Sequence, residues 1–258
     1  MFRALSLLLL LLASVGSAAA ETPDWRHAEE AVVEAVITGD TLRLGDGREL
    51  RLAAVRAPRP PLAYQRPDGW RREEAARAAL EALAPPGEKL RFLEVEAGRD
   101  RHRRLLVQAK NHQGVWLQQR LLIDGALLLE RLTDDVPPPL LSAEQEARLA
   151  GRGLWQDPAH AVVPADTAET AIGRFALVQG RVLAADAARG LGYLNFGEDW
   201  REDFTIRLPR SVVRQLEAEG RTIEQFAGRQ VMARGWVFYS GGPMIEVREL
   251  AEIVELTD

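Results

Sequence analysis

The chain has 258 residues, a formal net charge of −5 and no cysteine. Its hydrophobic share of 47% and charged share of 28% are globular proportions, and they exclude a disordered, collagenous or coiled-coil chain. Without cysteine there is no disulfide framework, thiol nucleophile or cysteine-ligated zinc site. The mild negative charge argues against binding nucleic acid through bulk charge alone, but it leaves room for a local basic site.

The N-terminus has the three parts of a secretory signal. Arg3 supplies a positive charge, residues 5–12 form an apolar run, and residues 18–20 are alanines of the size that a signal peptidase reads. An uncleaved membrane anchor is the alternative, but spanning a bilayer takes roughly 20 apolar residues. We therefore expect residues 1–20 to be a signal peptide cleaved near Ala20. The protein would then be exported, to the periplasm or the medium, without a stable membrane anchor.

Strands dominate the pattern up to about residue 157. Alternating or β-branched runs predict strands over 31–37, 41–44, 48–55, 90–96 and 104–109, and Gly45-Asp46-Gly47 is a strong hairpin turn. Apolar residues at helical spacing predict helices over 73–83, 117–123 and 143–150. Five strands with helices between them favour a small closed barrel of the oligonucleotide-binding (OB) type over residues 28–157.

Residues 158–169 lack useful periodicity and are expected to be a linker. Beyond them, residues 170–258 show predicted strands over 176–184, 191–196, 204–208, 230–238 and 244–247, and a predicted helix over 211–219. This pattern favours a second small OB-like barrel. The expected fold class is mainly β with helices (α+β), in two barrels.

Six landmarks in the first region, taken in order, resemble the thermonuclease (staphylococcal-nuclease-like) family. They are Gly39-Asp40-Thr41, the stretch Arg51 to Pro58, Glu73-Glu74-Ala75-Ala76, the run 100–104, the segment 122–126, and the closing residues 143–148 with Gly153-Leu154-Trp155. The resemblance implies an OB-type barrel and calcium-dependent hydrolysis of DNA and RNA phosphodiesters. It makes Asp40 the first calcium carboxylate, and Arg51 and Arg104 the two phosphate-clamping arginines.

Two positions depart from that family. Its second metal carboxylate corresponds to Arg56, and its catalytic glutamate corresponds to Arg59. A guanidinium neither ligates calcium nor acts as a general base, because it stays protonated. Asp40 alone is a weak calcium position, so no cofactor is expected unless the family site survives. Arg56 would either pair with Asp40 or replace the metal's charge toward a phosphate.

The sequence therefore predicts an exported nuclease-like protein that binds single-stranded DNA, RNA or another polyanion, with impaired or lost catalysis. The predicted substrate-binding set is Arg51, Arg56, Arg59, Arg101 and Arg104.

Two alternatives stay open. An active phosphodiesterase would need a relocated base, for which Asp68, Glu73 and Glu74 are candidates. A periplasmic interaction scaffold would use the C-terminal barrel, which has more acidic than basic residues, to bind a protein partner.

Overall fold

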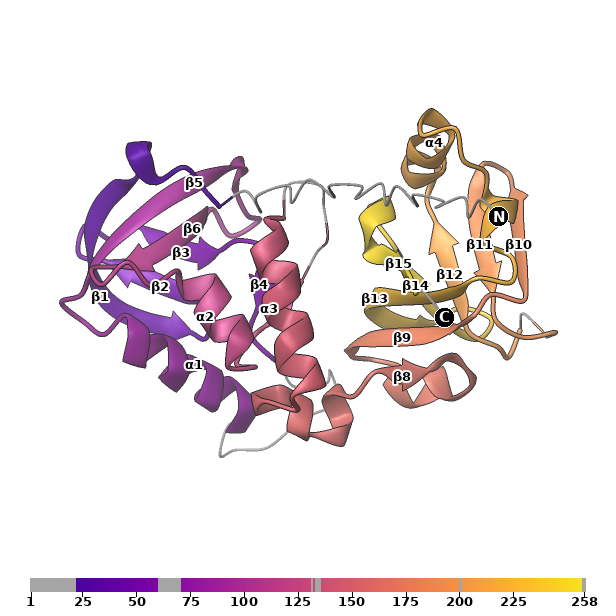
Figure 1. The fold of residues 1–258 in the computed structure, drawn as a ribbon, viewed down its shortest axis with the longest axis horizontal. Helices are drawn as coiled ribbons and strands as arrows, with labels where there is room; N and C mark the ends of the chain where they lie inside the picture. The colour runs from indigo at the N-terminus through magenta and orange to yellow at the C-terminus, as the bar shows by residue number, and fades with distance from the viewer. Residues whose placement is uncertain (1–21, 60–70, 131, 133–135, 200, 257–258) are drawn as a thin grey trace, which may run out of the picture.

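A computed structural model describes residues 22–59, 71–130, 132, 136–199 and 201–256. The predicted signal segment 1–20 and the candidate base Asp68 lie outside these residues. The fold is mixed α+β, with a closed five-stranded barrel, a larger separate sheet and few helices (Figure 1). None of the helices in the described ranges has the length and apolar character needed to cross a lipid bilayer.

The barrel closes in the order β1-β2-β3-β6-β5. Its strands are β1 (Glu29–Thr38), β2 (Thr41–Leu44), β3 (Glu49–Leu52), β5 (Lys89–Arg99) and β6 (Leu105–Asn111). Pairing of β1 with β5 closes the ring, and β3 runs parallel to β6 while the other neighbours are antiparallel. Each of the five predicted strands of this region is present, though some of their ends differ, and their apolar side chains fill the barrel core.

The predicted strand 48–55 is wrong at its C-terminal end. β3 stops at Leu52, and Ala54 adopts a φ of 65°, a conformation that breaks an extended strand. The chain then leaves the barrel as β4 (Val55–Arg56), which pairs with β7 (Leu128–Leu129). This departure carries Arg56 away from the barrel strands that hold Arg51.

Three helices accompany the barrel. They are α1 (Arg71–Leu83), α2 (Leu117–Ile123) and α3 (Pro138–Leu149), so α3 begins five residues before the predicted start. Proline suits that first turn because its missing N–H has no partner there. Helix α1 packs closely on the barrel, since a Cβ on Gly39 would lie 2.6 Å from the Ala76 Cβ.

The second region forms a sheet in the order β10-β11-β12-β14-β13-β9-β8, and β15 pairs with β13. The strands are β8 (Val163–Pro164), β9 (Phe175–Arg181), β10 (Ala184–Ala188), β11 (Leu191–Asn195), β12 (Thr205–Leu208), β13 (Gln230–Tyr239), β14 (Pro243–Glu246) and β15 (Ile253–Glu255). Helix α4 (Arg210–Ala218) follows β12. β12 pairs in parallel with β14. Apart from β8, the two ends of this order are β9 and β10, which are consecutive along the chain and separated only by residues 182 and 183. The second small barrel stays a prediction.

The predicted linker is built into this second sheet. β8 pairs in parallel with β9, and the 3₁₀ segment Ala165–Ala171 follows it. Val163 and Ala168 are buried in the second hydrophobic core. A two-residue strand has no periodicity to detect in the sequence, which is why this segment looked unstructured.

A buried polar network joins the two regions where α3 faces the second sheet (Figure 1). Arg234 of β13 donates to both carboxylate oxygens of Glu144, at 3.2 and 2.8 Å, and to the Leu129 carbonyl at 3.1 Å. The Leu129 N–H in turn donates to Glu144 at 2.7 Å. Ala251 and Val254 also pack against the barrel's core, so the C-terminal segment contacts both regions.

Candidate phosphate-binding site

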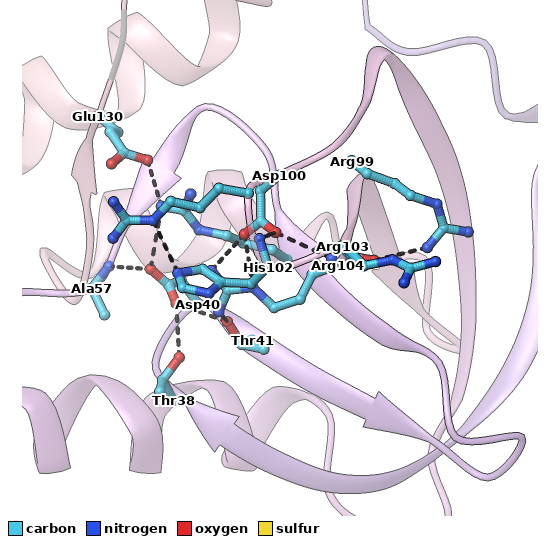
Figure 2. Close-up of polar contacts among 12 residues, drawn as sticks. Thr38, Asp40, Thr41, Ala57, Arg99, Asp100, His102, Arg103, Arg104 and Glu130 are labelled. Carbon is cyan, nitrogen blue, oxygen red and sulfur yellow. Dashed lines mark hydrogen bonds and ion pairs between the residues drawn. The ribbon is translucent and has the colours of Figure 1, made fainter.

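Asp40 lies at the centre of the candidate site, in the turn between β1 and β2. Its side chain has no exposed surface. One carboxylate oxygen accepts from the Thr38 hydroxyl at 2.7 Å and from the Thr41 hydroxyl at 3.0 Å, and the other accepts from the Ala57 N–H at 3.0 Å (Figure 2). Burial raises the pKa of Asp40, but the Ala57 N–H, the charge of Arg51 and the Thr38 hydroxyl outweigh it and leave the pKa below its usual range.

Arg51 projects from β3 toward two carboxylates. Its guanidinium forms a short ion pair with Glu130 and lies 3.9 Å from Asp40. Glu130 follows β7 directly and is 79 residues from Arg51 in the chain. Only 15% of the Arg51 side chain is exposed, and its buried Nε has no hydrogen-bond partner in the described part of the chain.

Arg56 does not join Arg51 in an open pocket. Its side chain is 5% exposed, and its guanidinium lies 4.6 Å from the ring centroid of Phe175 and 5.2 Å from that of Trp236. Its ionic partner in the described chain is Glu130 at 3.9 Å. The expected alternative, a direct pair with Asp40, is replaced by contact with the second sheet.

Arg59 is the most exposed of the arginines around Asp40. It lies 3.7 Å from the Asp40 carboxylate, and 40% of its side chain is exposed. Arg51 and Arg59 thus flank one buried carboxylate, and Arg59 extends from it toward solvent.

Arg104 contacts Thr41, the residue that follows Asp40 in the chain. It donates to the Thr41 hydroxyl at 3.1 Å and forms a two-pronged ion pair with Asp100, with nitrogen–oxygen distances of 2.8 and 2.6 Å. Asp100 also accepts from the backbone N–H groups of His102 and Arg104, which shapes the turn. The turn therefore holds Arg104 against Thr41, whose hydroxyl donates to Asp40 (Figure 2).

Three further arginines of the same turn are exposed. Arg101 donates to the His102 ring at 3.0 Å, Arg99 donates to the Arg103 carbonyl at 2.8 Å, and Arg103 has a φ of 66°. Arg101, predicted to bind substrate, thus lies on the rim of the site and not beside Asp40. The rim adds positive charge where solvent reaches it.

The calcium position implied by the thermonuclease resemblance does not fit these residues. Calcium in proteins takes six to eight oxygen ligands. Both Asp40 oxygens already accept hydrogen bonds, and two guanidiniums lie within 4 Å of one of them. A cation there would displace the hydrogen-bond donors of Asp40 and lie close to two positive charges.

Glu130 is the residue of this site that sequence reasoning missed. The predicted replacement carboxylates were Glu73 and Glu74 on α1 and Asp68 before it. Neither glutamate of α1 forms an ion pair with the site's arginines in the described chain. The only sequence signal for Glu130 was a charge directly after the apolar run 127–129, and the pairing of β7 with β4 is what brings it to Arg51.

A scan of the sequence against protein-family models finds no match, and a search of curated proteins also finds none. The resemblance to thermonucleases therefore stays a prediction from the landmark residues.

Proposed function

We propose that this is an exported protein that binds the sugar-phosphate backbone of single-stranded DNA or RNA at the arginine cluster around Asp40, without hydrolysing it. The observation that carries the proposal is the convergence of Arg51, Arg59 and Arg104 around one buried carboxylate and its neighbour Thr41. Guanidiniums in fixed orientation recognise phosphate oxygens through paired, charge-assisted hydrogen bonds.

The charge balance of the cluster sets the expected affinity. Asp40, Glu130 and Asp100 each interact with at least one of its guanidiniums. A phosphate must compete with these carboxylates, so binding is weak and sensitive to salt. The exposed arginines at 99, 101 and 103 then supply much of the attraction at longer range.

The absence of hydrolysis follows from what surrounds the clamp. Arg56 and Arg59 occupy the positions at which the thermonuclease resemblance implies a metal ligand and a catalytic base. The Asp40 carboxylate accepts three hydrogen bonds, and it could ligate a metal only by losing them. Of the two described carboxylates that pair with Arg51, Glu130 is the one with a partly exposed side chain. It therefore supports the second candidate, a phosphodiesterase with Glu130 as the base that activates water.

The test measures binding and cleavage of a fluorescent single-stranded oligonucleotide by the mature protein, at several salt concentrations, with calcium and with a chelator. Three phosphate contacts predict a slope of about −2 for log K against log salt on a single strand. Arg51→Gln and Arg104→Gln should each weaken binding about tenfold or more.

Arg120→Gln is the matched control, because Arg120 is an exposed arginine whose partner is Asp124, four residues along α2. No cleavage under either condition supports the proposal. Cleavage that Glu130→Gln abolishes would replace it with the second candidate. Binding unchanged in both clamp variants would remove the cluster from consideration.

A further inference from the structure

A small cavity between the barrel and the second sheet adjoins the cluster around Asp40 and shares Arg59 with it. Its volume is about 60 Å³, and its lining includes the side chains of Arg56, Arg59, Arg72 and Arg174 together with Phe175 and Trp236. The four arginines come from β4, the segment after it, α1 and the residue before β9. No carboxylate is part of this lining in the described chain.

Positive charge gathers at this cavity, although carboxylates outside its lining pair with Arg56, Arg59 and Arg72. Burial lowers the pKa of Arg56, and the charges of Arg59 and Arg51 lower it further, although Glu130 opposes the shift. At the other wall, burial and the charges of Arg72 and Arg174 lower the pKa of His160 to about 4. Positive charges that disfavour one another and converge on one cavity are relieved by a bound anion.

The arginines are held in place from outside the cavity. Arg72 forms a short ion pair with Asp157, and Arg174 donates to the Ala159 carbonyl at 2.6 Å. Arg56 lies over the rings of Phe175 and Trp236. Side chains fixed in this way lose little conformational freedom when a ligand binds.

We propose that this cavity binds the phosphate group of a nucleotide, with the nucleotide's base against Trp236. The cavity is a few times larger than the roughly 10–15 Å³ that one water needs, so it admits a tetrahedral anion and not a base. Trp236 is 39% exposed, so part of it remains open to a stacking partner outside the cavity.

The face of β13 that carries Trp236 extends beyond the cavity. Successive residues of a strand alternate between faces, so Trp236 and Phe238 share the face of β13 that carries Arg234 toward α3. The Arg207 guanidinium lies 5.5 Å from the Phe238 ring centroid. A base or sugar extending from the phosphate would meet an aromatic ring and a guanidinium along this face, a combination typical of sites for single-stranded nucleic acid.

The proposal does not rest on the function assigned to the cluster around Asp40. Arg59 lines both places, so it is left unchanged in the test. Isothermal titration calorimetry with inorganic phosphate, adenosine monophosphate and adenosine probes the cavity at low salt. We expect adenosine monophosphate to bind more tightly than phosphate, and adenosine to bind much more weakly than either.

Arg174→Gln and Arg72→Gln should each weaken phosphate and adenosine monophosphate about tenfold or more, because each removes a charge-assisted hydrogen bond. Trp236→Leu should weaken adenosine monophosphate but leave phosphate unchanged. Arg77→Gln is the control, since Arg77 is exposed on α1 and pairs with Glu81. Thermal unfolding of each variant establishes that it is folded, and two independent arginine variants keep the test valid if one of them is not.

A terminally phosphorylated oligonucleotide and its unphosphorylated counterpart separate the two sources of such a phosphate. Tighter binding of the phosphorylated strand than of adenosine monophosphate would assign the cavity to a strand end. Tighter binding of adenosine monophosphate would assign it to a free nucleotide. Either result supports the site. The proposal is overturned if folded wild-type protein binds neither phosphate nor adenosine monophosphate, or if both arginine variants bind like wild type. Loss of oligonucleotide binding in Arg51→Gln, with adenosine monophosphate still bound, would separate this site from the cluster around Asp40.

Discussion

Replacing Glu144 by glutamine tests the network that joins the barrel to the second sheet. Arg234 and Glu144 are each 5% exposed at the side chain, and their pair is two-pronged. The change leaves the Arg234 guanidinium buried without its counter-charge, while the shape of the side chain is kept. Breaking one partner of a buried pair costs about 3–5 kcal/mol, because the remaining charge stays out of water.

The same helix offers a matched control. Glu146 pairs with Arg152 at 2.8 Å, but both side chains are exposed, at 58% and 42%. Glu146→Gln should therefore change the free energy of unfolding by no more than about 1 kcal/mol. Urea unfolding followed by far-ultraviolet circular dichroism compares the two variants directly.

A double-mutant cycle with Glu144→Leu and Arg234→Met completes the experiment. The double variant leaves no buried charge, but Leu129 loses the partners of its N–H and its carbonyl, at about 1–3 kcal/mol each. We expect it to be less destabilised than the sum of the single variants, with a coupling energy of at least about 2 kcal/mol. Single variants that cost less than about 1 kcal/mol, or a purely additive cycle, would refute the claim that this pair joins the two regions.

Three further outcomes follow from particular residues. Gly153→Ala should lower the free energy of unfolding in urea by about 2 kcal/mol or more, because φ is +52° and a Cβ would lie 2.5 Å from the Asp124 carbonyl oxygen. Gly151→Ala is the control: its φ is +58°, but the space around it is open, so it should cost less. Equal costs for the two variants would contradict the steric reason. The pKa of His160 is lowered from 6.5 to about 4 in the folded protein, so as the pH falls the unfolded state binds this proton first. The contribution of His160 to the free energy of unfolding should therefore be fully present above pH 6.5 and be lost, by up to about 3 kcal/mol, as the pH falls to 4. His160→Gln should flatten that part of the stability–pH profile, and an unchanged profile would exclude His160 as its cause. The Tm should be the same in calcium and in a chelator, because an ion that bound the native state would raise the Tm. A higher Tm in calcium would show that Asp40 or another group binds the ion.

Local sequence signals were sufficient for most of the barrel. The alternation along 31–37 and 90–96, the glycine-bounded turn at 45–47 and the helical spacing over 117–123 each depend on residues close together in the chain. The landmark residues also have local physical causes. Gly39 has no room for a side chain beside Ala76, and Gly153 has none beside Asp124. Such constraints leave a trace in the sequence because few residue types satisfy them.

Local signals failed where a short element is stabilised only by its partners. β4 and β8 are two residues long, and each exists because a distant strand, β7 or β9, supplies the hydrogen bonds. The barrel predicted for the second region stays a prediction. Strand periodicity says which residues are buried but not which strands pair with one another.

For the candidate site, the sequence determined the inventory of charges and the tertiary structure decided their partners. Residue order alone supplied the resemblance that matches Asp40, Arg51 and Arg104 to thermonuclease positions and sets Arg56 and Arg59 where that resemblance implies acids. That Glu130 neutralises Arg51, and that Arg56 packs on Phe175 instead of pairing with Asp40, required the fold. An ion pair acts over a few ångströms in space, and only the closed barrel and its contact with the second sheet determine which charges come that close.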